Sequence, residues 1–353
     1  MTSPYTNYTY KFKTYNSKWA AVQAAHDDGL EAGVIYDKIG ITLGGSPSFF
    51  GNFNTTIEPK ESWEQLLADR AFLLRDTLPS INLSFSGGHD SYLMLKTFLS
   101  NNIKIDKIII DRYANDVISD LNFEQNHTAL NILKSLDLGT TKIIISNWND
   151  IDTWEKIALN EDSYFKSGLQ LFPNIGDISY RFATNRNTKG QPIIRGSTHP
   201  RIYYKDGKWR SHLWDADNFG GAYTTNSNFI PFFTDSQAPK LHLKQLHVTK
   251  NYFEKHNLHN VDEIENPLEY RKAYVSAVRL NASIDIFKSP FIPTKKLKNP
   301  LLSSKKIKFF SSLAKDKREG FEKLCDIFTI RLGGLPLLYH KSFIRIYDVA
   351  LEK

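Results

Sequence analysis

The segment 84–91, with the sequence SFSGGHDS, holds the residue types best suited to chemistry. Its two adjacent glycines allow a tight turn in which the backbone can approach a ligand closely. If a helix begins here, the amides from Gly87 to Ser91 point outward at its amino terminus and form a site for an anion such as pyrophosphate. Ser86 adds a hydroxyl donor, and Asp90 beside a phosphate is suited to bind Mg²⁺.

A strand and a helix must flank this segment to hold it in place. The pattern predicts a strand at 81–85 and a helix at 91–99, with the glycines in the turn between them. A capping-box sequence at 62–65 opens an earlier helix at 63–77, which Pro79 ends. Strand-like and helix-like runs then alternate, with strands expected at 105–110, 142–145 and 192–195 and helices at 123–136, 154–159 and 179–183. This alternation predicts an α/β fold with a parallel sheet and helices on both faces.

The rest of the chain shows a different pattern. The pair Asp206-Gly207 between aromatic residues predicts a β-hairpin over 201–209. Further elements are expected as a strand at 36–43 and helices at 239–256, 268–281 and 320–330. We therefore divide the chain into an amino-terminal extension at 1–75, an α/β domain at 76–260 and a helical, basic carboxy-terminal region at 261–353.

Polar residues follow several of the predicted strands, at the edge where parallel α/β sheets bind ligands. Arg195 and His199 could hold a phosphate there, or each could cap a helix or a loop. Lysines of the helix at 239–256 could also reach a phosphate, or they could form an exposed face. The remaining candidates at the strand ends are Asp111, Arg112, Ser146, Ser197 and Thr198, and the lysines are Lys240, Lys244 and Lys250.

Residues 86–91 match the five fixed letters of the signature SGGxDS, and the chain resembles the PP-loop ATP pyrophosphatases, which include the asparagine, GMP, NAD, argininosuccinate and tRNA lysidine synthetases. The phosphate-binding patterns GxxxxGK[ST] and GxGxxG do not explain this turn. The resemblance implies a Rossmann-like fold of the HUP type, with ATP and Mg²⁺ as cofactors. It also implies that a substrate oxygen attacks the α-phosphate of ATP, that pyrophosphate leaves, and that an amine or ammonia displaces AMP. The implied ATP-binding residues are Ser84, Ser86, Gly87, Gly88, His89, Asp90, Ser91 and Asp111.

The main catalytic task in this chemistry is to stabilise the charge of the departing pyrophosphate. We expect Asp90, Arg195 and Lys244 to contribute to it, and Asp90 and Asp217 to bind the metal ion. Asp217 belongs to a stretch, 215–223, that is similar to the acidic and FGGY region of asparagine synthetase-like proteins, although it lies later in the chain; a simple turn is the alternative.

Composition and charge indicate in which cellular compartment the protein works and which partners it could bind. The chain is 41% hydrophobic and 24% charged, as folded globular proteins are. Residues 1–13 lack the apolar stretch of a signal peptide, no long apolar run occurs, and the single cysteine, Cys325, favours a reducing compartment, so we expect a cytoplasmic protein that does not bind membranes. The net charge of +7 is concentrated at 288–318, where ten Lys/Arg face one acidic residue. This segment could bind tRNA or another nucleic acid, or form a solvated surface.

Residue types that the sequence lacks help to choose among the reactions of the PP-loop enzymes. Residue 2 is Thr2 rather than a cysteine, so a built-in glutaminase is unsupported and ammonia would come from a separate source. We therefore expect an AMP-forming ligase of asparagine synthetase type, which adenylates the carboxylate or carbonyl of a small-molecule acceptor and transfers it to ammonia or an amine. The alternatives are a nucleic-acid-modifying enzyme similar to tRNA lysidine synthetase, with 288–318 as its RNA-binding surface, and a non-catalytic nucleotide-binding module.

Overall fold

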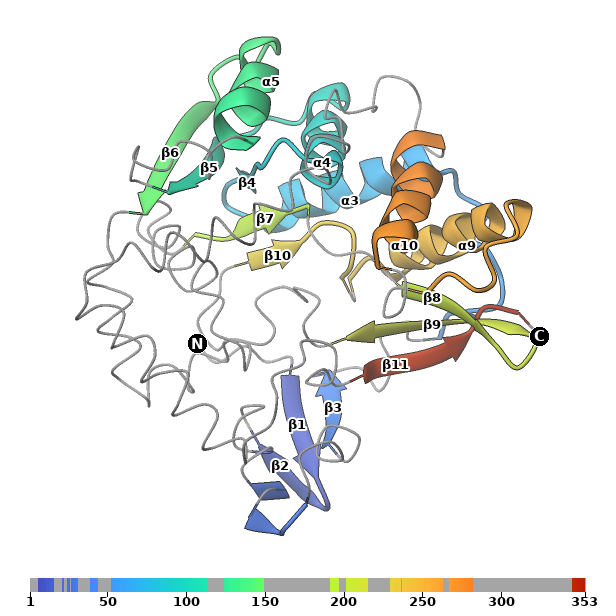
Figure 1. Cartoon of the computed structure of the whole chain (residues 1–353). Coiled ribbons are helices and arrows are strands. Elements are labelled where there is room, and N and C mark those ends of the chain that lie inside the picture. Colours follow the sequence, from blue (N-terminus) through green and yellow to red (C-terminus); the bar gives the residue numbers. More distant parts are fainter. Residues whose placement is uncertain are drawn as a thin grey trace, which may run out of the picture.

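The computed structural model describes residues 6–15, 21, 24–25, 27–30, 39–43, 52–113, 124–148, 191–196, 201–214, 229–235, 237–262, 267–281 and 345–352. Within these residues, Figure 1 shows a parallel sheet with helices packed beside it, a second sheet next to helix α9, and a third sheet that contains the earliest strands. None of the described helices is long and apolar enough to cross a membrane.

The central sheet is parallel, and in the described part of the chain it has five strands in the order β10-β7-β4-β5-β6. The first of these strands, β4, lies in the middle. The chain moves outward through β5 and β6 and then returns to β7 and β10 on the other side of β4, so the strand order reverses between β4 and β7. The α/β, Rossmann-like fold class predicted from the sequence is confirmed. The strands are β4 (Asn82–Ser84), β5 (Lys107–Tyr113), β6 (Lys142–Trp148), β7 (Ile193–Arg195) and β10 (Phe229–Pro231).

Runs of isoleucine explain why these segments form central strands. Ile108, Ile109 and Ile110 of β5 are all fully buried, although side chains alternate between the two faces of a strand. Ile108 and Ile110 belong to the main hydrophobic core, whereas Ile109 packs with Ile193 and Ile144 in a separate cluster. Both faces of the sheet are therefore covered at β5, as expected for a parallel sheet.

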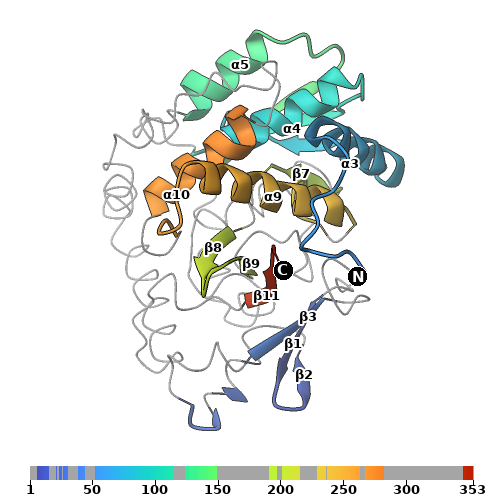
Figure 2. The same ribbon diagram turned by 90° about the vertical axis from the view of Figure 1, so that its right-hand side faces the viewer.

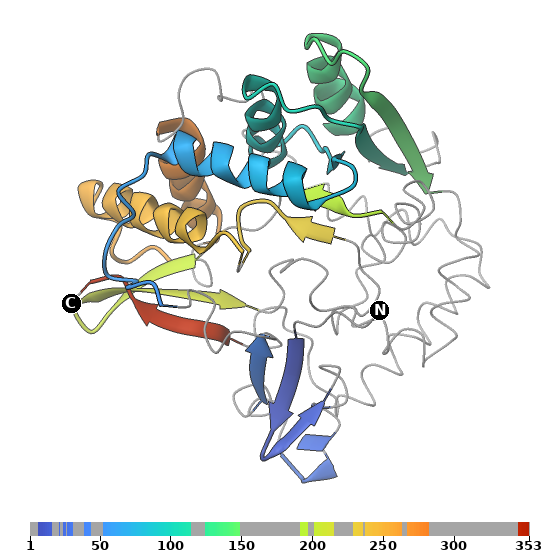
Figure 3. The same ribbon diagram turned by 180° about the vertical axis from the view of Figure 1, so that it is seen from behind.

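Three helices beside the sheet contribute to the main core: α3 (Trp63–Thr77), α4 (His89–Ser100) and α9 (Pro239–Lys255). Seen from behind, α3 runs along the sheet, with α4 and α9 next to it (Figure 3). The predicted start of α3 is confirmed, because the Ser62 side chain accepts a hydrogen bond from Gln65 N at 3.1 Å. Helix α3 crosses the predicted boundary at residue 75, and its buried residues belong to the main core. The division into three regions stays a prediction.

Two antiparallel sheets lie on the other side of α9 (Figure 2). The hairpin β8 (Arg201–Lys205) and β9 (Lys208–Trp214) confirms the prediction from Asp206-Gly207, whose φ angles of +52° and +75° are those of a type I′ turn. Strand β11 (Arg345–Ala350) pairs with β9. The third sheet has the order β2-β1-β3 and consists of β1 (Thr6–Tyr10), β2 (Lys13–Tyr15) and β3 (Ile39–Leu43).

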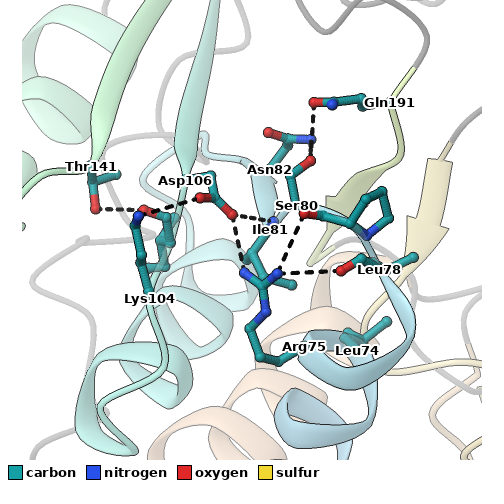
Figure 4. A network of polar contacts seen from close by, with 12 residues as sticks. Leu74, Arg75, Leu78, Ser80, Ile81, Asn82, Lys104, Asp106, Thr141 and Gln191 are labelled. Carbon is teal, nitrogen blue, oxygen red and sulfur yellow. Dashed lines mark hydrogen bonds and ion pairs between the residues drawn. The ribbon is translucent and has the colours of Figure 1, made fainter.

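A polar network fixes the amino ends of β4 and β5 (Figure 4). The Asp106 carboxylate accepts hydrogen bonds from Arg75 at 3.1 Å and from Ile81 N at 2.8 Å. The buried Asn82 amide donates to Ser80 Oγ and to Pro192 O, both at 2.9 Å. These contacts join α3 to β4, β5 and β7 at the end of the sheet where the strands begin. The opposite end, where the strands finish, is therefore the one available for a ligand.

Several elements differ from the sequence-based expectations. The predicted helix at 123–136 consists of a π-helix, η2 (Glu124–Ala129), followed by α5 (Leu130–Lys134). The predicted helix at 268–281 likewise consists of α10 (Pro267–Tyr274) and a π-helix, η4 (Val275–Asn281). Strands β1, β2, β10 and β11 were not predicted from the sequence. Because β11 lies at 345–350, the carboxy-terminal region is not purely helical. The predicted helices at 154–159, 179–183 and 320–330 and the basic segment 288–318 lie outside the described residues.

Candidate functional site

The segment 84–91 lies at the carboxyl end of β4, where the chain passes through a short turn into α4. Phe85 N donates a 2.9 Å hydrogen bond to Ile109 O, which extends the pairing with β5 by one residue beyond β4. On its other side, β4 pairs with β7. The turn at 85–88 therefore lies between β5 and β7 where the strand order reverses, which is the usual ligand-binding position in such sheets.

Gly87 has the backbone conformation that the turn requires and that a larger residue would strain. Its φ angle is +78°, in the left-handed region that glycine adopts without steric cost. A β-carbon at this position would lie 2.9 Å from the backbone nitrogen of Ala129 and 3.1 Å from Cγ2 of Thr128. The turn is therefore packed directly against the end of the π-helix η2, and π-helical segments are frequent at functional sites.

Two serines and Gly88 form a closed ring of hydrogen bonds in the turn. The buried Ser91 hydroxyl donates to Gly88 O at 3.1 Å and accepts from Ser86 N at 3.3 Å. Because the Ser91 proton is used in this way, the 3.2 Å contact between the two hydroxyls is a donation from Ser86 to Ser91. Gly88 N then donates to Ser86 Oγ at 3.4 Å. The contacts made by the exposed Ser86 are long, so this hydroxyl can be redirected to an anion at little cost.

Helix α4 directs its amino terminus at the turn. The N-cap is Gly88, which has no side chain to bond the first amides of this 12-residue helix. The positive end of the helix dipole therefore faces the turn and favours negative charge there. Asp90, in the first turn of α4, is half-buried and supplies one carboxylate beside this position.

The end of β7 lies against the first turn of α4. A β-carbon at Gly196 would be 2.7 Å from the Asp90 carbonyl oxygen and 2.9 Å from the Ser91 Cα atom. Only glycine fits between these two backbone segments as they stand. Gly196 directly follows the strand predicted at 192–195, and its neighbours Asp90 and Ser91 cannot be read from the sequence.

A pyrophosphate group fits this arrangement. The turn offers a close backbone approach at Gly87, the exposed Ser86 hydroxyl and a helix amino terminus, and such groups bind phosphates in proteins. Mg²⁺ bound to phosphates commonly needs only one or two carboxylates, and Asp90 supplies one at this place. The described residues contain no cluster of three or more His, Cys, Asp or Glu that could hold a metal ion by themselves. The described site therefore suits Mg²⁺ that arrives with phosphate.

Other predicted residues stand at the same edge of the sheet. Asp111 of β5 lies two residues beyond Ile109 and pairs in register with Ser146 of β6. Arg195 ends β7, pairs in register with Ser84, and its carbonyl oxygen accepts a 2.9 Å hydrogen bond from Phe232 N. The backbone thus places Asp111 and Arg195 on the two strands that flank β4. Their roles at a nucleotide stay predictions.

The lysines of α9 contact acidic residues. Lys244 Nζ lies 2.7 Å from Glu58 Oε1 and donates to Pro59 O at 3.0 Å. Lys240 forms an ion pair with Glu61, and Lys250 Nζ lies 3.2 Å from Glu254. Lys240 and Lys244 therefore bind residues 52–62 to α9, and the predicted catalytic role of Lys244 is not tested by these contacts.

Histidines of α9 are part of the core. His242 is fully buried, and burial lowers its pKa to about 3. His247 Nε2 lies 2.9 Å from Thr55 O, and burial also lowers its pKa. Both rings are therefore neutral near pH 7 and help to hold the helix in place. The predicted site residues Asp217, Ser197, Thr198 and His199 lie outside the described residues, as do the side chains of Asp111, Arg112 and Ser146.

Comparisons with known proteins give likenesses to solved structures only. A scan against protein-family models finds no match, and no curated protein matches the sequence. Among solved structures, the chain is similar to an NH3-dependent NAD synthetase from Campylobacter jejuni subsp. jejuni NCTC 11168, in complex with the nitrate ion. The identity is 14% and the TM-score is 0.28, over 79% of this chain and 99% of that chain.

Proposed function

We propose that the chain is an ATP pyrophosphatase-type ligase of the PP-loop superfamily. The observation that carries this proposal is the segment SFSGGHDS, which lies in the turn between β4 and α4 where the strand order reverses. The matched letters SGGxDS coincide with the residues that have the required geometry: the left-handed Gly87, the bonded hydroxyls of Ser86 and Ser91, and the first turn of α4, which contains Asp90.

In this proposal the turn binds the β- and γ-phosphates of ATP, which leave as pyrophosphate. The acceptor oxygen forms a bond to the α-phosphorus, and the bond between that phosphorus and the bridging oxygen of pyrophosphate breaks. Ammonia or an amine then attacks the adenylated carboxylate or carbonyl carbon, and AMP leaves with the bonding electrons. This amide-forming reaction is of asparagine synthetase type, and its ammonia would come from a separate source.

The residues of the chain act mainly through charge and position. The amides from Gly87 to Ser91 and the Ser86 hydroxyl stabilise the negative charge that grows on pyrophosphate. Asp90 would hold Mg²⁺ against the phosphates, and Asp217 is proposed as its second ligand. Mg²⁺, when bound, neutralises phosphate charge. Arg195 and Lys244 are proposed to stabilise the same charge, and Asp111 to contact the nucleotide.

The decisive experiment measures the products of ATP. The full chain is incubated with Mg²⁺, ATP and pools of amino acids, nucleosides or tRNA, and AMP, ADP and pyrophosphate are followed separately. We expect AMP and pyrophosphate in equal amounts, stimulated by one pool, and no product with Asp90→Ala. Asp76→Ala, an exposed change on α3, is the matched control and keeps full activity. ADP as the product, or normal turnover by Asp90→Ala, would show the proposal to be wrong.

A second candidate is a nucleic-acid-modifying enzyme of the same superfamily. The concentration of basic residues at 288–318 favours it. Lysines that bind the phosphates of a nucleic acid release the counterions condensed on it, and this release favours binding. Replacement of Lys305, Lys306 and Lys308 by Glu should then weaken tRNA binding and reduce its salt dependence. Unchanged tRNA binding would exclude this role. ATP binding without any AMP formation would instead favour a nucleotide-binding module.

A further inference from the structure

We propose that Gly196 is a positioning residue for the pyrophosphate-binding turn, because it allows the end of β7 to lie directly against the first turn of α4. This inference rests on the proposed function, since it concerns the same turn. Gly196 lies outside the segment 84–91 and more than a hundred residues later in the chain. It is brought to the turn by the pairing of β7 with β4.

The contact at Gly196 involves backbone atoms that cannot rotate away. A β-carbon here would lie 2.7 Å from the Asp90 carbonyl oxygen, 2.8 Å from the Asp90 carbonyl carbon and 2.9 Å from the Ser91 Cα atom. These distances are well below the usual 3.5–4.0 Å between carbon atoms in contact. A methyl group at residue 196 must therefore push β7 and the start of α4 apart.

The displaced atoms are those that would bind the ligand. Asp90 carries the carboxylate proposed for Mg²⁺, and Ser91 completes the ring of hydroxyls with Ser86. Glycine serves a similar purpose in dinucleotide-binding folds, where it permits close packing of a helix on a strand. Misplacement of a substrate by about 1 Å can lower a catalytic rate about a hundredfold. A small shift of α4 should therefore weaken the contacts of the turn with the phosphates.

The other side of the turn is held by the π-helix η2. The position of a Gly87 β-carbon is 2.9 Å from Ala129 N and 3.1 Å from Thr128 Cγ2, so η2 closes that side. The turn and the start of α4 are therefore packed between the end of β7 and η2. Gly139 provides a contrast: a β-carbon there meets no atom within 4 Å, although its φ angle of +53° also strains an alanine.

The test compares the binding of Mg²⁺-pyrophosphate and Mg²⁺-ATP to the full chain and its variants by isothermal titration calorimetry. Urea unfolding of each variant shows that it is folded during the titration. We expect Gly196→Ala to weaken pyrophosphate binding by about tenfold or more. Gly139→Ala is the matched control, because it strains a left-handed backbone without touching the turn. It should lower stability and keep the pyrophosphate affinity within about twofold.

The outcomes separate this inference from the proposed function. A wild-type chain that binds neither ligand would overturn the proposed function and this inference with it. A wild-type chain that binds pyrophosphate, together with a folded Gly196→Ala that binds it equally well, would overturn the inference alone. If Gly196→Ala does not fold, hydrogen exchange of the wild-type chain decides. We expect Mg²⁺-pyrophosphate to slow the exchange of the amides at 194–196 together with those at 88–92, and unchanged exchange at 194–196 would overturn the inference.

Discussion

Arg70 and Asp235 form an ion pair inside the protein, with Arg70 Nη2 at 2.5 Å from Asp235 Oδ2 and no part of the Arg70 side chain exposed. The guanidinium also donates to the carbonyl oxygens of Pro231 at 2.9 Å and Phe232 at 3.2 Å. Arg70 belongs to α3, and the other residues lie at the end of β10 and in the turn that follows. The pair therefore connects α3 to the edge strand of the central sheet.

Removal of either member of this pair should destabilise the fold. Asp235→Ala leaves a buried guanidinium without its carboxylate, and we expect the free energy of unfolding in urea to fall by about 3–5 kcal/mol. Arg70→Met should cost a similar amount, because two carbonyl oxygens also lose their donor. Asp76→Ala, on the exposed face of the same helix, should change stability by less than about 0.5 kcal/mol. A loss below about 1 kcal/mol in Asp235→Ala would contradict the structural role of the pair.

Replacement of Ser86 and of Ser91 by alanine should affect the stability of the protein differently, although both changes should weaken pyrophosphate binding. Ser91 is buried and bonds Ser86 N and Gly88 O, so Ser91→Ala should cost about 1 kcal/mol in urea unfolding and also weaken pyrophosphate binding. Ser86 is exposed, so Ser86→Ala should leave stability within about 0.5 kcal/mol and still weaken pyrophosphate binding by about tenfold. Calorimetric titration with pyrophosphate checks both variants. Unchanged affinity in Ser86→Ala would exclude its hydroxyl as a ligand.

The buried His242 should make stability depend on pH. Burial lowers its pKa to about 3 in the folded chain, against 6.5 in the unfolded chain, so the unfolded chain binds the extra proton first as the pH falls. The stabilisation is therefore complete above pH 6.5 and is lost progressively between pH 6.5 and about 3. From pH 7.5 to 5, this group should lower the free energy of unfolding by about 2 kcal/mol.

Urea unfolding at these two pH values checks the effect of His242. His247 should add to the loss of stability in acid, because burial lowers its pKa as well. A His242→Leu variant has no group to protonate at this position and should show a smaller loss between pH 7.5 and 5. An identical pH dependence in the variant and the wild type would contradict the assignment.

Lys244 and Glu58 allow a structural role to be distinguished from a catalytic one. Their ion pair at 2.7 Å is partly buried, with 14% of the Lys244 side chain exposed, so Lys244→Ala and Glu58→Ala should each cost about 1 kcal/mol of stability. If Lys244 also acts on phosphate, Lys244→Ala alone should lower AMP formation. Equal AMP formation by the two variants would restrict Lys244 to its structural role.

The elements that were predicted well have strong local signals. The Ser62 cap and Pro79 define α3, the Asp206-Gly207 turn defines the hairpin, and the isoleucine run of β5 marks a strand buried on both faces. The turn at 84–91 was also recognisable, because its glycines and hydroxyls are adjacent in the sequence. Local chemistry therefore reveals both the α/β class and the centre of the candidate site.

The elements that were missed depend on distant partners. Strand β10 has three residues, ends in a proline, and is a strand only because it pairs with β7. Strand β11 exists through its pairing with β9. The π-helices depend on a hydrogen-bond register that a periodicity of 3.6 residues does not encode. Gly196 could be recognised as important only when its neighbour Asp90 was known.

The hydrogen bond from Thr55 Oγ1 to Ala350 O, at 2.9 Å, joins residues 295 positions apart and has a consequence for folding during synthesis. The strands of the central sheet are complete once Pro231 has left the ribosome, so this sheet can begin to form on the emerging chain. The edge of β9 that binds β11 must wait until Ala350 emerges. Closing so large a loop is slow, and an unpaired strand edge promotes association between chains. Until Ala350 emerges, the free edge of β9 is therefore a place where the growing chain can associate with other chains.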